Sequence, residues 1–208
     1  CDADEAARIV AAARRAGRRT FALCSGSDGV DLALRAGFDS IEHGFFVTRQ
    51  QLERMAELQV TWVPTFAPVH FQWRRPDVAG WSAQTVGGIR RILDEHAQRL
   101  VEALSIGVPV LVGSDAGSIG VPHGEGLITE IELMAGTGAG IERLLHGATA
   151  LPRTLWGRPP TGIVPGVRAE LVLLDRSPMD DVRALRRVAA VYRNGWDSPL
   201  EQRPALTH

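Results

Sequence analysis

Short runs of apolar residues alternate with longer segments of helical periodicity along the first two-thirds of the chain. Thr48 precedes Gln51 by three residues, which is the spacing of a capping box at the start of a helix. Strands that alternate with helices in this way favour βα units around a parallel sheet. The expected strands are 20–23, 39–42, 60–63 and 108–112, and the expected helices are 4–16, 28–36, 48–58 and 84–105.

This alternation is interrupted after the third expected strand. Residues 64–82 contain three prolines and several aromatic side chains, and we expect a long loop there. Helices are expected again at 127–135 and 141–156. The glycine-rich segment 136–140 follows a helix rather than a strand, so it is expected to be a helix–helix turn and not a nucleotide-binding loop.

The pattern changes again near residue 158. Apolar runs at 171–175 and 188–192 have no long helix between them, which indicates a separate β segment. The predicted organisation is a partial barrel of βα units over 1–158, a β-sandwich segment over 159–197 and a tail over 198–208.

Composition and charge exclude several classes of protein. The 208 residues are 45% hydrophobic and carry a formal net charge of -1, so no basic face is available for nucleic acid. All 23 basic residues are arginine, and a chain without lysine offers neither a Schiff base nor a carboxylated lysine. Two cysteines, Cys1 and Cys24, are expected to be free thiols. With no long apolar run and an acidic first segment, the sequence predicts a cytoplasmic protein that does not contact a membrane.

Polar side chains stand where two of the expected strands end. His43 follows the strand at 39–42, and Asp115 follows the strand at 108–112. The carboxyl ends of parallel strands share one edge, where ligands bind, and an imidazole with a carboxylate suits a divalent metal or a proton transfer. The alternative is that His43 is a hydrogen-bonded helix-entry residue and Asp115 is an N-cap.

Other histidines and a cysteine have two interpretations each. His123 lies in a glycine-flanked loop and is either solvent-exposed or placed over the same edge. His70 either lines a pocket or packs among aromatic residues. His96 stands among polar residues in a helix and is expected at the surface. His146 ends a helix, where a partial positive charge complements the helix dipole, and it is expected to have a structural role. Cys24 is expected to be a buried small hydrophobe rather than a thiol ligand.

Several motifs, in order along nearly the whole chain, resemble those of the amidohydrolase superfamily, in its prolidase-like and imidazolonepropionase-like branch. Residues 36–44 are similar to its sixth-strand motif, and residues 110–117 to its eighth-strand motif. His123-Gly124 resembles the following loop, residues 145–153 the next helix, and residues 161–175 the return into the β-sandwich.

The resemblance implies an α/β fold, namely the C-terminal half of a (β/α)8 TIM-type barrel with a small β-sandwich segment. It also implies hydrolysis of amide or other C–N bonds at a divalent metal centre, for which we expect zinc. In the family pattern His43 is a metal ligand, Asp115 is a metal ligand and proton acceptor, and His123 contacts substrate. Trp62 and His70 belong to an aromatic region expected to line a pocket for a small amide-type substrate.

The sequence departs from the family pattern at one ligand position. Leu23 stands where the fifth strand ends in a histidine, and Cys24 next to it would point to the opposite face of the strand. The ligands of the first and fourth strands are not among these residues. We therefore expect the chain to act with a second copy or with a complementing N-terminal chain. The alternatives are a metal-free remnant serving as a scaffold or interaction subunit, and a free-standing α/β domain that binds an anion.

Overall fold

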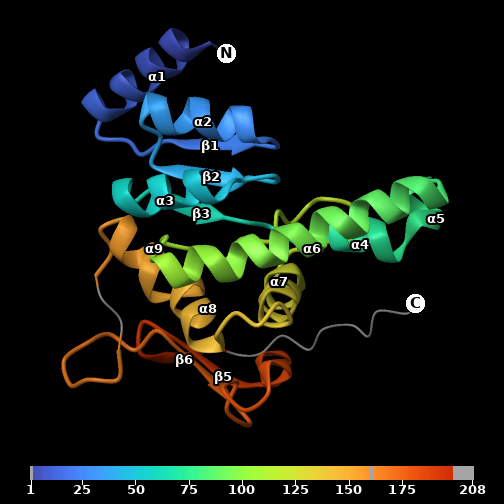
Figure 1. The fold of residues 1–208 in the computed structure, drawn as a ribbon. Coiled ribbons are helices and arrows are strands. Elements are labelled where there is room, and N and C mark those ends of the chain that lie inside the picture. Colours follow the sequence, from blue (N-terminus) through green and yellow to red (C-terminus); the bar gives the residue numbers. More distant parts are fainter. Residues whose placement is uncertain (1, 160–161, 199–208) are drawn as a thin grey trace. The chain divides into compact units, whose positions relative to one another are not determined.

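The computed structural model describes residues 2–159 and 162–198 (Figure 1). These divide into two compact units, residues 1–148 and 149–208, and each is described by itself. The predicted thiol of Cys1, the first residue of the 161–175 motif, and residues 199–208 of the predicted tail lie outside the described residues. The predicted domain boundary near residue 158 stays a prediction.

A three-stranded parallel sheet forms the centre of the first unit. Its strands β1 (Phe21–Cys24), β2 (Ser40–His43) and β3 (Thr61–Val63) lie in sequence order, as the alternating pattern predicts. β3 is buried on both faces, so Trp62 has no exposed surface. Burial of such a side chain stabilises a fold by several kcal/mol, on the order of 25 cal/mol per Å² of apolar surface.

Three helices accompany these strands: α1 (Ala3–Arg15), α2 (Ser27–Ala36) and α3 (Arg49–Leu58). The capping box at the start of α3 is confirmed, because the Thr48 side chain accepts from the Gln51 amide and the Gln51 side chain accepts from the Thr48 amide. α2 ends where Gly37 adopts a left-handed conformation. Leu52 and Met55 of α3 are completely buried, which anchors this helix to the core.

The prediction of a long loop at 64–82 is wrong, because this segment contains two short helices. These are α4 (Ala67–Arg74) and α5 (Pro76–Ala79), and α6 (Ala83–Ile106) follows. Proline stands in the first turn of both short helices, where its missing N–H would have no helical partner in any case. Figure 1 shows α4 and α5 beside the first half of α6.

The fourth expected strand, 108–112, is an extended segment beside β3 rather than a strand. The Trp62 amide donates to the Pro109 carbonyl, and the Leu111 amide donates to the Trp62 carbonyl, which makes one parallel bridge. The ladder ends there, since the Val112 amide donates instead to the Gly147 carbonyl. The fold class is therefore α/β with a parallel sheet, and no closed barrel is seen within residues 2–159 and 162–198.

α7 (Glu125–Ala135) and α8 (Ile141–Ala148) complete the first unit, and the predicted turn at 136–140 lies between them. The helix expected over 141–156 is instead two helices, because α9 (Ala150–Leu155) begins anew after Thr149. Proline at position 152 has no N–H for the carbonyl of Ala148, which prevents one continuous helix.

The second unit contains an antiparallel sheet, in the order β4 (Leu171–Leu174), β5 (Val188–Arg193) and β6 (Trp196–Ser198), with a 3₁₀ turn at Val182–Arg186. The two predicted strands are confirmed. β6 was not predicted, although Asn194-Gly195 is a strong hairpin signal and both residues have positive φ. Across the part of the chain that the structure describes, no helix is long and apolar enough to span a membrane.

Candidate active site at the carboxyl edge of the sheet

His43 ends β2 in a turn that Trp62 holds. The backbone of His43 has φ 64° and that of Gly44 has φ 62°, both in the left-handed region. The Trp62 indole N–H donates to the His43 carbonyl at 2.9 Å. A Cβ on Gly44 would lie 2.8 Å from Trp62 Nε1, so only glycine fits this close approach.

Asp115 lies at the same edge of the sheet. It comes just after the extended segment 108–112, which lies beside β3. It has φ 51°, it is exposed, and its carboxylate accepts from the Ser118 hydroxyl at 2.8 Å. The segment approaches β3 closely, since a Cβ on Gly113 would lie 2.6 Å from Val63 Cγ1. Backbone strain of this kind concentrates at functional sites, and both predicted ligands carry it.

The loop after Asp115 rests on α4. A Cβ on Gly120 would lie within 2.2 Å of the Phe71 ring, so the loop and the helix touch through these two residues. His123 is exposed in this loop, and its Nε2 lies 3.8 Å from where a Cβ on Gly117 would be. Its predicted contact with substrate stays a prediction.

The two other predicted substrate-binding residues differ in exposure. His70 on α4 is half-buried against the Trp73 ring, with the ring centroids 5.4 Å apart. Burial lowers the pKa of His70, and the positive charges of Arg74 and Arg90 lower it further. Trp62 is fully buried with its indole hydrogen-bonded, so it belongs to the core, and this burial does not favour the substrate contact predicted for it.

His96 is not a surface residue, and that expectation is wrong. Only 2% of it is exposed, and its ring is surrounded by those of Phe45, Trp62 and Phe66 at centroid distances of 4.5, 5.2 and 4.8 Å. Burial lowers its pKa to about 4, a hydrogen bond to the Pro64 carbonyl opposes the shift, and nearby His43 adds to it. The signal was present in the sequence, since His96 shares a heptad-like spacing with the buried residues Leu93, Leu100 and Ala103.

Glu130 on α7 is a second buried polar residue that the sequence analysis missed. It is completely buried, and burial raises its pKa to about 7, against two backbone hydrogen bonds that lower it. Its spacing from the buried Met134 places it on the core face of the helix, and this was the signal available.

The structure supports the predicted orientation of Cys24. Cys24 is buried while Leu23 is 73% exposed, so the two side chains lie on opposite faces of β1. Burial raises the pKa of the thiol, which disfavours the thiolate needed for metal binding. The position that Leu23 occupies therefore has no substitute ligand in its neighbour.

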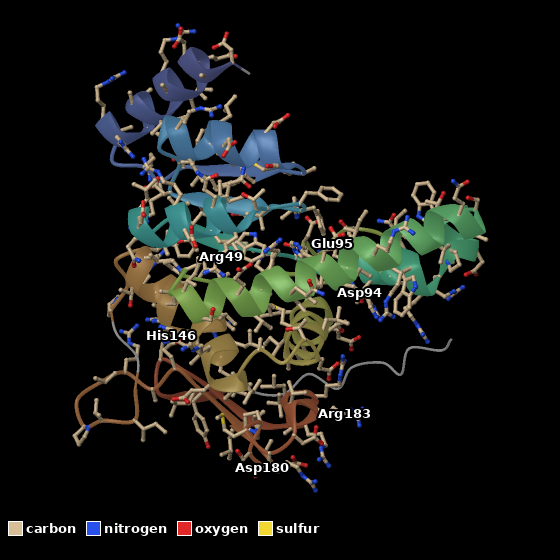
Figure 2. The ribbon with its side chains drawn as sticks, viewed as in Figure 1. Arg49, Asp94, Glu95, His146, Asp180 and Arg183 are labelled. Atoms are coloured by element: carbon tan, nitrogen blue, oxygen red, sulfur yellow. The ribbon has the colours of Figure 1, made fainter. Side chains whose placement is uncertain are left out.

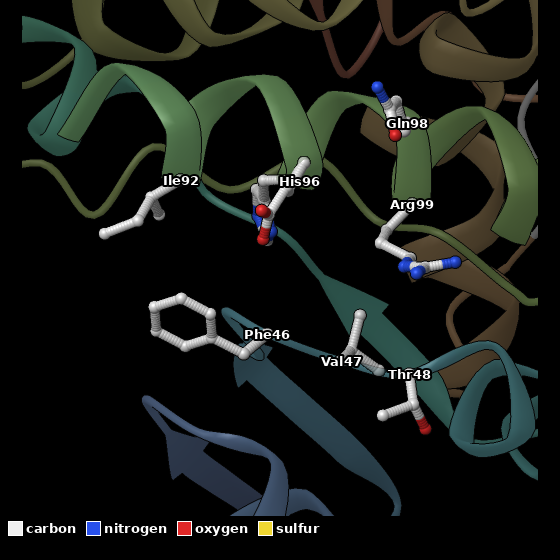
Figure 3. Close-up of a pocket in the computed structure, with 8 residues that line it drawn as sticks. Phe46, Val47, Thr48, Ile92, His96, Gln98 and Arg99 are labelled. Atoms are coloured by element: carbon white, nitrogen blue, oxygen red, sulfur yellow. The ribbon is translucent and has the colours of Figure 1, made fainter. Parts of the chain in front are cut away.

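A pocket of about 420 Å³ lies between α6 and the loop after β2 (Figure 3). Phe46 and Thr48 line it on the loop side, and His96 and Arg99 line it on the helix side. None of the predicted site residues lines this pocket. In the described ranges, no three His, Cys, Asp or Glu side chains gather closely enough to hold a metal ion. These residues by themselves do not fit a metal centre.

Comparison with known proteins identifies the architecture. No protein-family model matches the sequence. The structure is similar to a Xaa-Pro dipeptidase with bound methionine (TM-score 0.80, 24% identity, 94% of this chain and 48% of that one). It is similar also to a candidate prolidase from Bifidobacterium longum (TM-score 0.81, 25% identity, 95% and 51%).

The sequence gives the same relationship. It is 24% identical over 189 residues to ochratoxinase from Aspergillus niger, which covers 88% of this chain and 38% of that protein. An uncharacterised protein of Mycobacterium tuberculosis is 27% identical over 179 residues, covering 86% and 47%. The chain is a homologue of amidohydrolase-superfamily proteins of the prolidase and ochratoxinase type, and it spans about half of their length or less.

The hydrogen bond from Trp62 to His43 leads to a prediction about stability. Trp62→Phe is expected to lower the free energy of unfolding by about 2 kcal/mol, because it leaves the His43 carbonyl without its donor and opens space in the core. Trp81→Phe is the matched control, since Trp81 is exposed and its indole N–H donates to the Gln72 side chain. Urea unfolding measures both variants, and equal losses would contradict the prediction.

Proposed function

We propose that this chain supplies the C-terminal half of a metal-dependent hydrolase that cleaves amide or other C–N bonds of a small substrate. One observation carries the proposal: His43 at the end of β2 and Asp115 after the segment bridged to β3 flank the same strand, both with left-handed backbone, on a fold that matches half of prolidase-type structures. Trp62 lies between them, hydrogen-bonded to His43 and bridged to the segment that leads to Asp115.

The residues of this half have distinct proposed roles. His43 and Asp115 are two ligands of a divalent metal, zinc by preference, whose other ligands come from outside the described residues. The exposed carboxylate of Asp115 is also the group that accepts a proton from the attacking water. His123 and His70 border the space for the substrate.

The open side of the sheet indicates where the rest of such a site would be attached. β1 is an edge strand, and its side chains Phe21 and Leu23 are 71% and 73% exposed. Exposed apolar side chains on an unpaired edge favour association. We propose that either a complementing N-terminal half or a second copy covers this edge.

The test begins with native mass spectrometry of the tagged chain, purified from its own source together with whatever binds it, with zinc supplied. Zinc in a species larger than one chain is expected, with hydrolysis of X-Pro dipeptides or N-acyl amino acids. Asp115→Asn is expected to lower that hydrolysis at least about 100-fold, the usual contribution of a general base.

Two exposed residues provide matched controls. Asp94→Asn removes an exposed carboxylate on α6 that pairs with Arg90, and it is expected to leave the rate unchanged. Figure 2 shows Asp94 and Glu95 on this helix. His146→Gln serves the same purpose for His43→Gln. An unchanged rate in Asp115→Asn would remove Asp115 from the mechanism.

A second candidate function is a metal-free scaffold or interaction subunit that keeps the fold. Leu23 favours it, because an exposed leucine on β1 can bind a partner but cannot bind a metal. A metal-free complex without hydrolysis in the first experiment would support this alternative over the hydrolase.

A further inference from the structure

The turn that connects β3 to α4 has a strained and buried backbone. It consists of Pro64, Thr65, Phe66 and Ala67, all of them buried. Thr65 has φ 59°, which is unfavourable for a β-branched residue. A turn of this conformation persists only where its surroundings hold it.

Glu130 holds the turn from α7. Its Oε1 accepts from the Phe66 amide and its Oε2 accepts from the Ala67 amide, both at 2.7 Å. These amides belong to the start of α4, where Phe66 is the N-cap and provides no side-chain hydrogen bond. A carboxylate from another helix therefore supplies the cap that α4 lacks. Its negative charge is also stabilised by the positive end of the α4 helix dipole.

His96 holds the same turn from α6. Its Nε2 lies 2.9 Å from the Pro64 carbonyl, and because a carbonyl only accepts, Nε2 carries the proton. The unprotonated Nδ1 is buried and has no hydrogen-bond partner among the residues that the structure describes, at a cost that an apolar side chain would avoid. The useful property of histidine at this position is therefore the donor on Nε2.

The turn lies next to both candidate ligands of the proposed hydrolase. Trp62 and Val63 directly precede the turn. The Trp62 indole N–H donates to the His43 carbonyl, and Val63 Cγ1 lies so close to Gly113 that a Cβ on Gly113 would collide with it. A shift of the turn would displace β3, and with it the hydrogen bond that fixes the backbone of His43.

We propose that His96 and Glu130 are positioning residues that clamp the Pro64–Ala67 turn between the two candidate ligands at the carboxyl edge of the sheet. The functional meaning of the clamp rests on the proposed function, but the clamp itself is a property of this chain. It is measured without metal or substrate, so its failure is distinguishable from a failure of the hydrolase proposal.

Amide hydrogen exchange of the full chain, followed by NMR, tests the clamp. In Glu130→Gln, whose amide group has only one acceptor oxygen, exchange is expected to rise at least tenfold at whichever of the Phe66 and Ala67 amides loses its acceptor, with exchange in β1 and β2 unchanged. Glu95→Gln is the matched control on an exposed carboxylate. Unchanged exchange at both amides in Glu130→Gln would overturn the role of Glu130.

The role of His96 is tested by two substitutions of similar size. His96→Leu removes the donor and is expected to speed exchange at Thr65 and Phe66. His96→Gln can place an N–H near the former Nε2 and is expected to restore at least part of the protection. If both variants exchange alike, the donor is not what holds the turn, and the role of His96 is refuted.

The wild-type chain provides a test that does not depend on whether a variant folds. Ring ¹⁵N shifts of His96 are expected to show a protonated Nε2 and an unprotonated Nδ1. The amides of Phe66 and Ala67 are expected to exchange much more slowly than that of the exposed Gly140. Equal exchange at these positions, or the opposite tautomer, would overturn the proposal.

Discussion

As the pH rises from 4.5 to 6.5, the free energy of unfolding of Glu130→Gln is expected to rise by about 2 kcal/mol relative to that of wild type, and that of His96→Gln is expected to fall by about as much relative to wild type. The pKa of Glu130 is raised from 4.5 to about 7, so this carboxyl contributes stability at low pH that is lost as the pH rises. The pKa of His96 is lowered from 6.5 to about 4, so neutral His96 contributes stability at higher pH that is lost as the pH falls.

These two contributions have opposite signs in the same pH window. In wild type the two contributions nearly cancel. Relative to each other, the folded state holds one extra proton on Glu130, and the unfolded state holds one extra proton on His96. When either group is removed, the contribution of the other is no longer cancelled. The free energy of unfolding then changes with pH at a slope approaching about 1.4 kcal/mol per pH unit. Urea unfolding at pH 4.5, 5.5 and 6.5 measures the slopes, with Glu95→Gln and His146→Gln as matched substitutions at exposed positions. Slopes of the same sign in both buried variants would contradict the prediction.

Gly120→Ala is expected to lower the free energy of unfolding by about 3 kcal/mol. The φ of 77° costs an alanine about 1–2 kcal/mol, and the new methyl group would collide with the Phe71 ring, which adds about 1–3 kcal/mol. Gly80→Ala is a matched control, because Gly80 has φ 71° but no atom within 4 Å of the added Cβ.

The steric part of this loss is separable from the backbone part. In the background of Phe71→Ala, Gly120→Ala is expected to cost about as much as Gly80→Ala, since the ring is gone. The coupling in this double-mutant cycle, measured by urea unfolding, reports the contact between the loop and α4. A cost of Gly120→Ala that is independent of Phe71 would show that the loop does not rest on this helix.

Much of the sheet was predictable because its signals are local. The strands expected at 20–23, 39–42 and 60–63 lie within one residue of β1, β2 and β3, because each is a short segment between helical stretches, and the cap of α3 follows from two residues three apart. The helices at 67–79 were missed because proline was interpreted as a breaker, whereas in the first turn it favours a helix. One bridge at Val110 in place of a strand depends on the competing hydrogen bond to Gly147, which is remote in sequence.

The candidate site was predictable only in part. His43 and Asp115 were found because each comes within three residues of the end of an expected strand. His96 and Glu130 were missed because polar residues were assigned to the surface from their neighbours in sequence, not from their spacing to apolar positions. Their partners are backbone groups of Pro64, Phe66 and Ala67, 32 to 64 residues away, and no pattern of side chains encodes such a bond.

The unpaired edge of β1 has a kinetic consequence. Any strand that comes to lie beside it from another chain does so in a second-order step, whose rate depends on protein concentration rather than on the chain alone. Until that step, Phe21 and Leu23 offer the same apolar surface to correct and incorrect neighbours. If a second chain covers this edge, as proposed above, recovery of native protein from denaturant is expected to pass through an optimum concentration, below which pairing is slow and above which aggregation outpaces it.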